Sequence, residues 1–388
     1  MERIHVGIVG GGLHSVIIAA YLNKVFGHIF NIRILEPLPL AGSWKNATTA
    51  LGMQSLRSPW THGITEIGPE LFNYAMTHGI EAASTPRPSL PIFNAYLDSV
   101  ITKLKLEELH LQSRVAGIKK IENGFEVTSA GNFKYMMENV ILATGRGLPN
   151  IPKDISGIGL AEHASRISVH DGDWQGKTIA VIGGGLTATT LIHSLLRSGA
   201  NVFQIIRGQK QQVVAFDFDK GWFGGILYER LREIDDPAAQ LAFLNQETVH
   251  GSIPPDHYFT SLEWMRAGRL TVREKTTVAA LKQRGNTIEV QLVNQDSVEA
   301  HQVILATGYT ASATELSCLG PILNDLKLHE GLIVLEKDLS ASNVPGLYVT
   351  GGLARLRLGH AAPNIYGAHL AAELLIPSLK TRLTSPGR

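Results

Sequence analysis

The stretch Val6-Gly7-Ile8-Val9-Gly10-Gly11-Gly12-Leu13-His14-Ser15 decides the fold. It is an apolar run that ends in three glycines, followed by an apolar segment, 16–22, that can form a helix. This order predicts a strand, a tight turn and a helix, the opening of a dinucleotide-binding unit. In the fingerprint, Gly10-x-Gly12-x-x-Ser15, serine replaces the third glycine. A pyrophosphate would lie at the helix N-terminus, where free N–H groups favour anions. The residues expected to contact it are Gly10, Gly12, Leu13, His14 and Ser15.

A carboxylate follows at the spacing that such a unit requires. Residues 31–36 are predicted to form a second strand, which ends in Glu36, 26 residues after Gly10. A carboxylate at this place accepts hydrogen bonds from ribose hydroxyls and repels a 2′-phosphate. The alternative interpretation is a solvated glutamate at the end of a strand.

The same pattern of strand, glycine turn and helix recurs later in the chain. Residues 177–188 again read as strand, glycines and helix, with the fingerprint Gly183-x-Gly185-x-x-Ala188. The following strand, 201–206, ends at Arg207 and not at an acid, and Lys210 lies three residues further on. Arginine at this place accommodates the 2′-phosphate of NADP, although a solvated loop cation is the alternative. The first unit is therefore predicted to bind FAD and the second NADPH. The residues expected to contact NADPH are Gly183, Gly185, Leu186, Thr187 and Arg207.

Composition narrows the classes of protein. The 388 residues leave room for two or three domains, and the net charge of +1 gives no sign of a nucleic-acid partner. The single cysteine, Cys318, excludes an internal disulfide and the cysteine pair of flavin disulfide reductases. No apolar run is long enough to span a membrane or to act as a signal peptide, so a cytoplasmic enzyme without a membrane partner is expected. The 15 histidines lack metal-ligand spacing, and no metal site is predicted.

Short motifs follow the first unit in a fixed order. Gly42-Ser43-Trp44 ends a predicted loop that begins at Pro37, Met53-Gln54 comes next, and segments 71–74 and 87–97 follow. In this order they resemble the class B flavin monooxygenases, which include the lysine and ornithine N-hydroxylases. The resemblance implies that Gln54 contacts the isoalloxazine ring of the FAD. Trp44 either covers a face of the cofactor or serves as a hydrophobic plug. The cofactor contacts expected from this region are Pro37, Gly42, Ser43, Trp44, Met53 and Gln54.

The resemblance fails at one position that has a role in the family. The ornithine N-hydroxylases place a Lys-Asp pair shortly after Met-Gln, and the lysine helps to seat the amino acid. This chain has Arg57-Ser58-Pro59 instead. The departure leaves the identity of the substrate open.

Two Ala-Thr-Gly turns mark where the chain leaves the first domain and where it returns. They are Ala143-Thr144-Gly145 and Ala306-Thr307-Gly308-Tyr309, and the second is a marker of the same family. A strand leading to Gly351-Gly352 and a last helix from Asn364-Ile365 follow. By resemblance, the positive end of this helix points at the flavin pyrimidine ring and stabilises the anionic reduced form. The cofactor contacts expected here, with Val115 near the adenine, are Val115, Thr144, Gly145, Thr307, Gly308, Tyr309, Gly352, Asn364 and Ile365.

These observations predict an α/β protein with two Rossmann-like dinucleotide-binding domains. The FAD-binding domain is discontinuous, over 1–168 and 300–388, and the NADPH-binding domain, 169–299, is inserted into it. Apolar spacing predicts a helix over 97–109, an antiparallel meander over 110–135, and strands of the second sheet at 270–273 and 287–292.

Two segments are less regular. Residues 208–262 are expected to form a long insertion without a regular pattern. Its aromatic, glycine-rich part, 216–225, either forms a lid or packs against the other domain or a second subunit. His163-Ala164-Ser165 partly matches a histidine signature that precedes the NADPH turn in the family.

The resemblance implies an NADPH-dependent flavoprotein monooxygenase. NADPH would reduce the FAD, and the reduced flavin would add O₂ to form a C4a-hydroperoxide that oxygenates a small nucleophilic substrate containing N or S, with N-hydroxylation as the favoured reaction. No side chain needs to act as a covalent nucleophile, so no catalytic residue is assigned. Two alternatives stay open: an FAD-dependent NADPH oxidoreductase with an external acceptor and no stable hydroperoxide, and an FAD-bound scaffold or sensor. A homo-oligomer is also open, because relatives often form dimers or tetramers.

Overall fold

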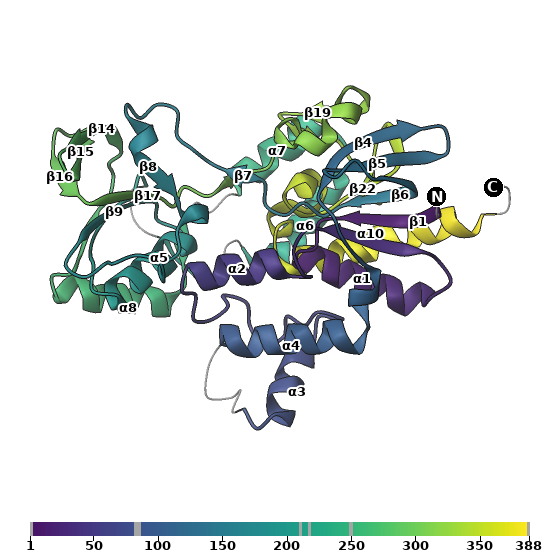
Figure 1. Cartoon of the computed structure of the whole chain (residues 1–388), viewed down its shortest axis with the longest axis horizontal. Coiled ribbons are helices and arrows are strands. Elements are labelled where there is room, and N and C mark those ends of the chain that lie inside the picture. Colours follow the sequence, from purple (N-terminus) through teal and green to yellow (C-terminus); the bar gives the residue numbers. More distant parts are fainter. Residues whose placement is uncertain (1–2, 81–86, 209–211, 216–218, 248–250, 386–388) are drawn as a thin grey trace.

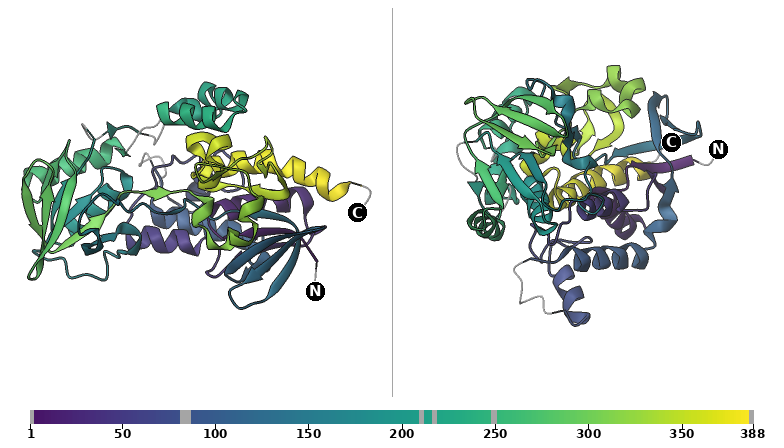
Figure 2. Two further views of the ribbon diagram at one scale, coloured as in Figure 1. Left: turned by 90° about the horizontal axis from the view of Figure 1, so that it is seen from above. Right: turned by 60° about the vertical axis from the view of Figure 1, so that its left-hand side comes forward.

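The chain folds into two lobes that lie side by side (Figure 1), as seen in a computed structural model that describes residues 3–80, 87–208, 212–215, 219–247 and 251–385. Both described ends of the chain belong to one lobe, which we call the first lobe. The second lobe holds residues from the middle of the sequence. Views from above and from the side show the same division (Figure 2).

The first lobe is built on an eight-stranded sheet. Its middle is parallel in the order β22-β6-β1-β2-β3, and antiparallel strands β21, β5 and β4 extend it. Parallel strands covered on both faces are almost wholly apolar, as β1 is. The strands are β1 (Arg3–Val9), β2 (Ile32–Glu36), β3 (His110–Gln112), β4 (Val115–Ile121), β5 (Gly124–Ser129), β6 (Lys134–Leu142), β21 (Ser340–Ala341) and β22 (Val344–Val349).

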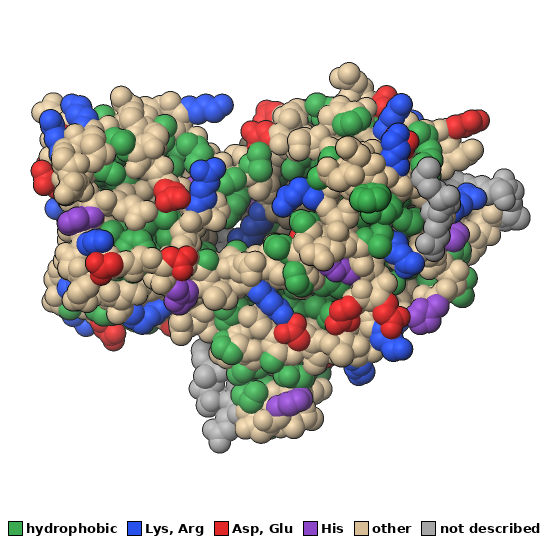
Figure 3. Space-filling model, in the orientation of Figure 1, with side chains coloured by type: hydrophobic (Ala, Val, Ile, Leu, Met, Phe, Trp, Pro, Cys, Tyr) green, Lys and Arg blue, Asp and Glu red, His purple; other side chains and the backbone are tan. Residues whose placement is uncertain are grey.

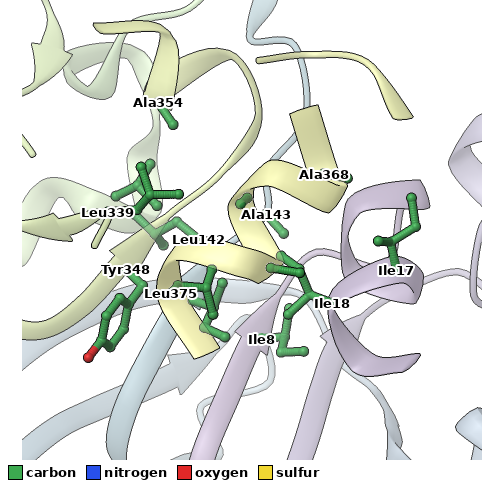
Figure 4. Packing of buried hydrophobic residues seen from close by; sticks show 14 of the residues in the cluster. Ile8, Ile17, Ile18, Leu142, Ala143, Leu339, Tyr348, Ala354, Ala368 and Leu375 are labelled. Atoms are coloured by element: carbon green, nitrogen blue, oxygen red, sulfur yellow. The ribbon is translucent and has the colours of Figure 1, made fainter. Parts of the chain in front are cut away.

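Helices α1 and α10 cover this sheet and pack against each other. Figure 4 shows Ile18 of α1 next to Ile8 of β1, with Ala368 and Leu375 of α10 in the same hydrophobic cluster. A helix enclosed between a sheet and another helix needs apolar residues on several faces, which explains the composition of α1. The helices of this lobe are α1 (Leu13–Phe26), α2 (Gly42–Ala50), α3 (Glu70–Thr77), α4 (Leu90–Lys103), α9 (Arg355–Leu358) and α10 (Ile365–Thr384).

The second lobe has a parallel sheet in the order β13-β10-β9-β17-β8. Alternate residues of β9 face opposite sides: Ile179 and Val181 join the core under α5, while Ala180 joins the core under an antiparallel sheet, β14-β15-β16. The elements are β8 (Ala161–His163), β9 (Thr178–Ile182), α5 (Leu186–Arg197), β10 (Asn201–Ile205), α8 (Pro255–Arg266), β13 (Leu270–Arg273), β14 (Val278–Arg284), β15 (Thr287–Leu292), β16 (Ser297–Ala300) and β17 (Gln302–Leu305).

Short elements complete the chain. The strand pairs are β7 (Leu148–Pro149) with β18 (Tyr309–Thr310), β11 (Gln212–Val213) with β12 (Ser252–Ile253), and β19 (Leu328–His329) with β20 (Leu332–Ile333). The 3₁₀ helices are Leu106–Leu109, Ile158–Leu160, Ala164–Arg166, Lys220–Trp222, Ala313–Glu315, Ser317–Asp325, Gly351–Ala354 and Gly359–Ala361. Two sheets with parallel strands, in each of which one strand leads directly into a glycine turn, confirm the predicted fold class.

Two predicted elements differ from the structure in their bounds or type. The helix predicted over 97–109 is α4, which starts after extended Ser89 with a proline in its first turn and ends before Lys105, whose φ of +51° interrupts the helix. Gly42 to Trp44, predicted as loop, are the first residues of α2, because Ala41 has a left-handed conformation and its N–H is fixed by Gly11 O at 2.6 Å.

The two predicted β-regions also need correction. In the region 110–135, β3 pairs in parallel with β2, and only β4 and β5 belong to the antiparallel hairpin, which continues into β6. The strand predicted at 287–292 is β15, which lies in the separate antiparallel sheet and not in the parallel one. A strand in which apolar and polar residues alternate can lie at a sheet edge, in a meander or in a second sheet. The pattern alone therefore could not predict which strand it pairs with.

The segment 208–262 contains regular structure that the sequence pattern did not indicate. Besides β11, β12 and α8 it forms α6 (Ile226–Glu233) and α7 (Pro237–Gln246), the latter capped by the Asp236 side chain. Residues of α6 and α7 join the hydrophobic core of the first lobe. Trp222 is fully buried there, with its ring 5.8 Å from the Phe243 ring and 5.1 Å from the His360 ring. Packing against the other lobe is thus the role of Trp222, whereas residues 216–218 lie outside the described part.

Replacing Trp222 with alanine should destabilise the protein strongly. Removing a buried tryptophan costs about 3–5 kcal/mol, because both transfer free energy and packing are lost. Urea unfolding measured by circular dichroism tests this, with Phe259→Ala as the control, since Phe259 is 63% exposed. The control should change the free energy of unfolding by less than about 0.5 kcal/mol. Equal losses in both variants would contradict the anchoring role of Trp222.

Candidate cofactor-binding site

The first glycine turn is held by two close contacts. Gly10 has φ of +104°, and a Cβ there would lie 2.5 Å from Ala143 O at the end of β6. Ser15 is fully buried, and its Oγ donates a hydrogen bond to Gly10 O at 2.5 Å. Serine in the third position thus ties the helix to the turn. By contrast, Gly12 has ordinary backbone angles and no atom within 4 Å of its Cβ position, which leaves space on the open side of the turn.

Glu36 is placed at this turn, as the sequence predicts. One carboxylate oxygen accepts a hydrogen bond from Gly11 N at 2.8 Å and the other from Leu38 N at 3.1 Å. The carboxylate is half-buried. Because a carboxylate has about four acceptor positions, room remains for ribose hydroxyls.

Three strand ends of the first sheet meet at this point. The Ala143-Thr144-Gly145 turn lies between the first glycine turn and Gly351-Gly352, with Gly352 N donating to Gly145 O at 3.0 Å. Ligands of open parallel sheets bind outside the carboxyl ends of their strands, where these turns lie.

Two buried nitrogen atoms of predicted FAD contacts have no hydrogen-bond partner among the described residues. His14 is 8% exposed; its Nδ1 lies 2.8 Å from Thr350 Oγ1, while its Nε2 has no such partner. Burial lowers the pKa of His14 to about 4, so the ring is neutral near pH 7. The other atom is Trp44 Nε1. Unpaired buried donors are costly in a folded protein, and together with the open space at Gly12 they fit a bound polar cofactor such as FAD.

The N-terminus of α10 lies beside the same turn. The backbone of Pro363 and Asn364 is close enough to the His14 ring to affect its pKa. Asn364 is extended and directly precedes the helix, in which Ile365 is buried. A helix of 20 residues presents free N–H groups and a positive dipole end at this point.

The remaining predicted FAD contacts differ in their exposure. Trp44 packs edge-to-face on Phe93, with ring centroids 6.0 Å apart, as its interpretation as a hydrophobic plug predicts. Its indole nitrogen has no hydrogen-bond partner among the described residues, which is compatible with a contact to the cofactor as well. Met53 packs partly against the core, whereas Gln54 is exposed and donates to Gly52 O at 3.0 Å. Pro37 and Val115 are half-buried.

The second glycine turn repeats the construction of the first. Gly183 has φ of +143° and packs against Ala306 O, as Gly10 packs against Ala143 O. Leu186 and Thr187 are half-buried at the start of α5, and Ala188 is fully buried. Gln204, which the sequence interpretation missed, donates to Gly183 O at 2.9 Å. Arg207 is exposed after β10, and Lys210 lies outside the described residues.

The two Ala-Thr-Gly turns lead into the linkers between the lobes, and these linkers pair. Tyr309 is the Cα partner of Pro149, and Asn150 N donates to Gly308 O at 2.9 Å. Thr307 Oγ1 donates to Asn150 O at 2.5 Å. His163 lies at the same point, with its Nε2 3.0 Å from Gly308 O and its ring against Tyr309. The partial histidine signature therefore marks the junction between the lobes.

A hollow separates the two lobes on the face shown in Figure 3, with basic side chains inside it. Among the described residues, no group of His, Cys, Asp and Glu is arranged to hold a metal ion, and no helix is long and apolar enough to cross a membrane. Cys318 is buried, and burial raises its thiol pKa.

Two glycine substitutions should separate folding from cofactor binding. Gly10→Ala places a Cβ against Ala143 O at a left-handed φ, so the unfolding temperature of the apoprotein should fall. Gly12→Ala meets no atom of the protein, so that temperature should stay the same, while the methyl group blocks the pyrophosphate. FAD should then bind at least about tenfold more weakly, a loss of about 1.4 kcal/mol. Calorimetry measures the unfolding temperatures, and FAD titration measures the affinities. An unchanged FAD affinity in Gly12→Ala would contradict the assignment of this turn as the FAD-binding site.

Comparison with known proteins places this geometry in context. A family model described as pyridine nucleotide-disulphide oxidoreductase matches residues 65–251. The structure of an ornithine N-hydroxylase from Kutzneria sp. 744 is 17% identical and has a TM-score of 0.83, covering 99% of this chain and 100% of that chain. The cadaverine monooxygenase of Erwinia amylovora, whose structure has FAD bound, is 15% identical with a TM-score of 0.81, covering 100% and 97%.

The L-lysine 6-monooxygenase of Pseudomonas syringae gives a similar result. It is 18% identical, has a TM-score of 0.79, and covers 98% of this chain and 100% of that chain. The likeness therefore extends over both lobes and both glycine turns. At these identities it establishes the architecture: the chain has the fold of the ornithine, lysine and cadaverine monooxygenases.

Proposed function

We propose that the protein is an FAD- and NADPH-dependent monooxygenase that oxygenates a small nucleophilic substrate, with N-hydroxylation of an amine as its reaction. The observation that carries the proposal is the presence of two complete glycine turns in one chain whose whole length matches N-hydroxylating enzymes. The two turns differ where the ligands would differ, because the strand after the first ends in Glu36 and the strand after the second is followed by Arg207.

The proposed roles follow from the contacts. Around FAD, Gly10, Gly12 and Ser15 form the pyrophosphate turn, Glu36 accepts the ribose hydroxyls, and the α10 N-terminus favours negative charge on the flavin. The other proposed FAD contacts are Leu13, His14, Pro37, Gly42, Ser43, Trp44, Met53, Gln54, Val115, Thr144, Gly145, Gly352, Asn364 and Ile365. For NADPH we propose Gly183, Gly185, Leu186, Thr187 and Arg207, with Thr307, Gly308 and Tyr309 at the junction.

The same proposal divides the chain into units. Residues 1–168 and 300–388 form the FAD-binding unit, and residues 169–299 form the NADPH-binding unit. The presence of a separate parallel sheet on each side supports a division into two units. β8 and β17 lie just outside the range 169–299 but pair in the second sheet, so that sheet extends a few residues beyond both proposed bounds. A supply of NADPH and a small substrate suits a cytoplasmic location.

The chemistry would be that of the cofactors, which transfer hydride from NADPH to the flavin and activate O₂. For an amine the balance is NADPH, H⁺, O₂ and R-NH₂ consumed, with NADP⁺, H₂O and R-NHOH formed. The chain must bind both nucleotides, orient them and exclude water. Neutral His14 and the buried residues around it, including Thr350, would exclude water.

The partition of oxygen between product and peroxide tests this function. NADPH oxidation by the FAD-loaded protein is followed with a panel of diamines, ω-amino acids and thioethers, while H₂O₂ and hydroxylated product are quantified. We expect a substrate that lowers the H₂O₂ released per NADPH and yields hydroxylamine in its place. If H₂O₂ accounts for all NADPH with every compound and ferricyanide accelerates turnover, the protein is an oxidoreductase with an external acceptor.

Arg207 should determine the choice between NADPH and NADH. In Arg207→Glu we expect NADPH to bind about 10- to 100-fold more weakly, because a charged hydrogen bond of about 1.5–3 kcal/mol to the 2′-phosphate is lost. NADH affinity should change less than about twofold. Arg266→Glu is the control, since Arg266 is also an exposed arginine of the second lobe. Titration of flavin reduction gives both constants; equal losses for NADPH and NADH would reject the role of Arg207.

A further inference from the structure

The segment 51–57, which carries Gln54, is held by the second lobe at both of its ends. At its start, α2 ends beside the second lobe (Figure 1), and Val169 N donates to Ala50 O at 2.8 Å. The Ser194 hydroxyl of α5 lies 3.0 Å from Leu51 O and 3.2 Å from Gly52 O. Gly52 has φ of +65°, and a Cβ there would lie 2.5 Å from Ser194 Oγ. The contact therefore requires glycine at this position.

At the other end, the Arg57 guanidinium binds the inserted part of the second lobe. Its Nε donates to Ala215 O at 3.1 Å, and its Nη2 donates to Val214 O at 2.7 Å. Two further bonds go to Ser252, from Nη1 to the carbonyl oxygen at 3.1 Å and from Nη2 to Oγ at 3.0 Å. At least four of the five guanidinium N–H groups are thus used within the protein. Ser252 is 5% exposed, and the two bonds to it are partly buried, whereas the bonds to Val214 and Ala215 are exposed.

Ser252 also lies next to the second glycine turn. A Cβ on its neighbour Gly251 would lie 3.4 Å from the carbonyl carbon of Gly184, and a Cβ on Gly185 would lie 3.5 Å from Gly251 Cα. The backbone at Gly251 therefore touches the turn proposed to bind the NADPH pyrophosphate. One residue later, the carbonyl oxygen of Ser252 accepts one hydrogen bond from Arg57, and its side-chain hydroxyl accepts another.

The short segment between Arg57 and Gln54 is itself fixed. Leu56 is 2% exposed and its N–H donates to Pro88 O at 3.0 Å, while Gln54 O accepts from Leu90 N at 2.9 Å. Ser55 and Ser89 form a β-bridge between these two bonds. A displacement of Arg57 is therefore passed to Gln54 rather than absorbed by a loose loop.

We propose that Arg57 is a positioning residue that couples the NADPH turn to the flavin contact Gln54, through Gly251 and Ser252. The coupling rests on the proposed function, in which Gln54 touches the flavin and Gly184-Gly185 touch NADPH. Arg57 aligns the two cofactors for hydride transfer and contributes little to the affinity for either. Its guanidinium is committed to Val214, Ala215 and Ser252 and does not seat a substrate.

Anaerobic stopped-flow reduction of the FAD-loaded protein by NADPH tests this role. In Arg57→Met we expect the limiting rate of flavin reduction to fall about tenfold or more, the Kd of NADPH to change less than threefold, and the flavin absorbance spectrum to shift. Arg57→Lys, which keeps a donor, should restore part of the rate. Ser252→Ala should slow reduction in the same sense, and combining it with Arg57→Met should add nothing further, because both act on one link.

The control is Arg284→Met. Arg284 forms an ion pair with Glu289 in the antiparallel sheet β14-β15-β16, so the flavin of this variant should be reduced at the normal rate. A normal rate in Arg57→Met, or a higher Kd with an unchanged rate, overturns the coupling. If Arg57→Met does not fold, additive effects of Arg57→Lys and Ser252→Ala overturn it. Wild-type flavin that dithionite reduces but NADPH does not would instead reject the proposed function itself.

Discussion

The close approach of a glycine to a neighbouring strand end is the constraint on which both lobes depend. Gly10 packs against the carbonyl oxygen of Ala143, and Gly183 packs in the same way against that of Ala306. Each contact forces the chain to turn sharply at the carboxyl end of a parallel strand, with φ in the region that favours glycine. A helix begins directly after each turn, and at Gly12 the first of these helix N-termini faces open space, which is the property that an anionic nucleotide requires.

The sequence could predict the features that depend on local chemistry. The glycine turns, the acid at Glu36 and the two Ala-Thr-Gly turns each have a backbone or charge requirement that few residues meet, and the structure has them at the predicted strand ends. The pairing partners of strands with alternating apolar and polar residues could not be predicted, because the residue patterns of β3 and β15 are compatible with several kinds of sheet.

The insertion shows why long-range packing escapes sequence reasoning. The α6 and α7 helices lie within the part of the sequence that follows the second glycine turn, yet their apolar residues complete the core of the first lobe. Nothing in the spacing of Leu227 or Leu231 says which lobe they will contact. The same holds for Arg57, whose partners Val214 and Ser252 are more than 150 residues away in the sequence. Such contacts are fixed only when both lobes are assembled.

The paired linkers have a consequence for how the molecule is put together. Because Tyr309 pairs with Pro149, the chain enters and leaves the second lobe at the same point. A segment whose two ends are adjacent can be inserted into, or removed from, a loop of a host domain without distorting it. Removing the whole segment would nevertheless open the core of the host, because Trp222 and the apolar residues of α6 and α7 come from it. The second lobe is therefore a cassette with two attachments, the two-stranded stem and the packing of α6 and α7 on its host.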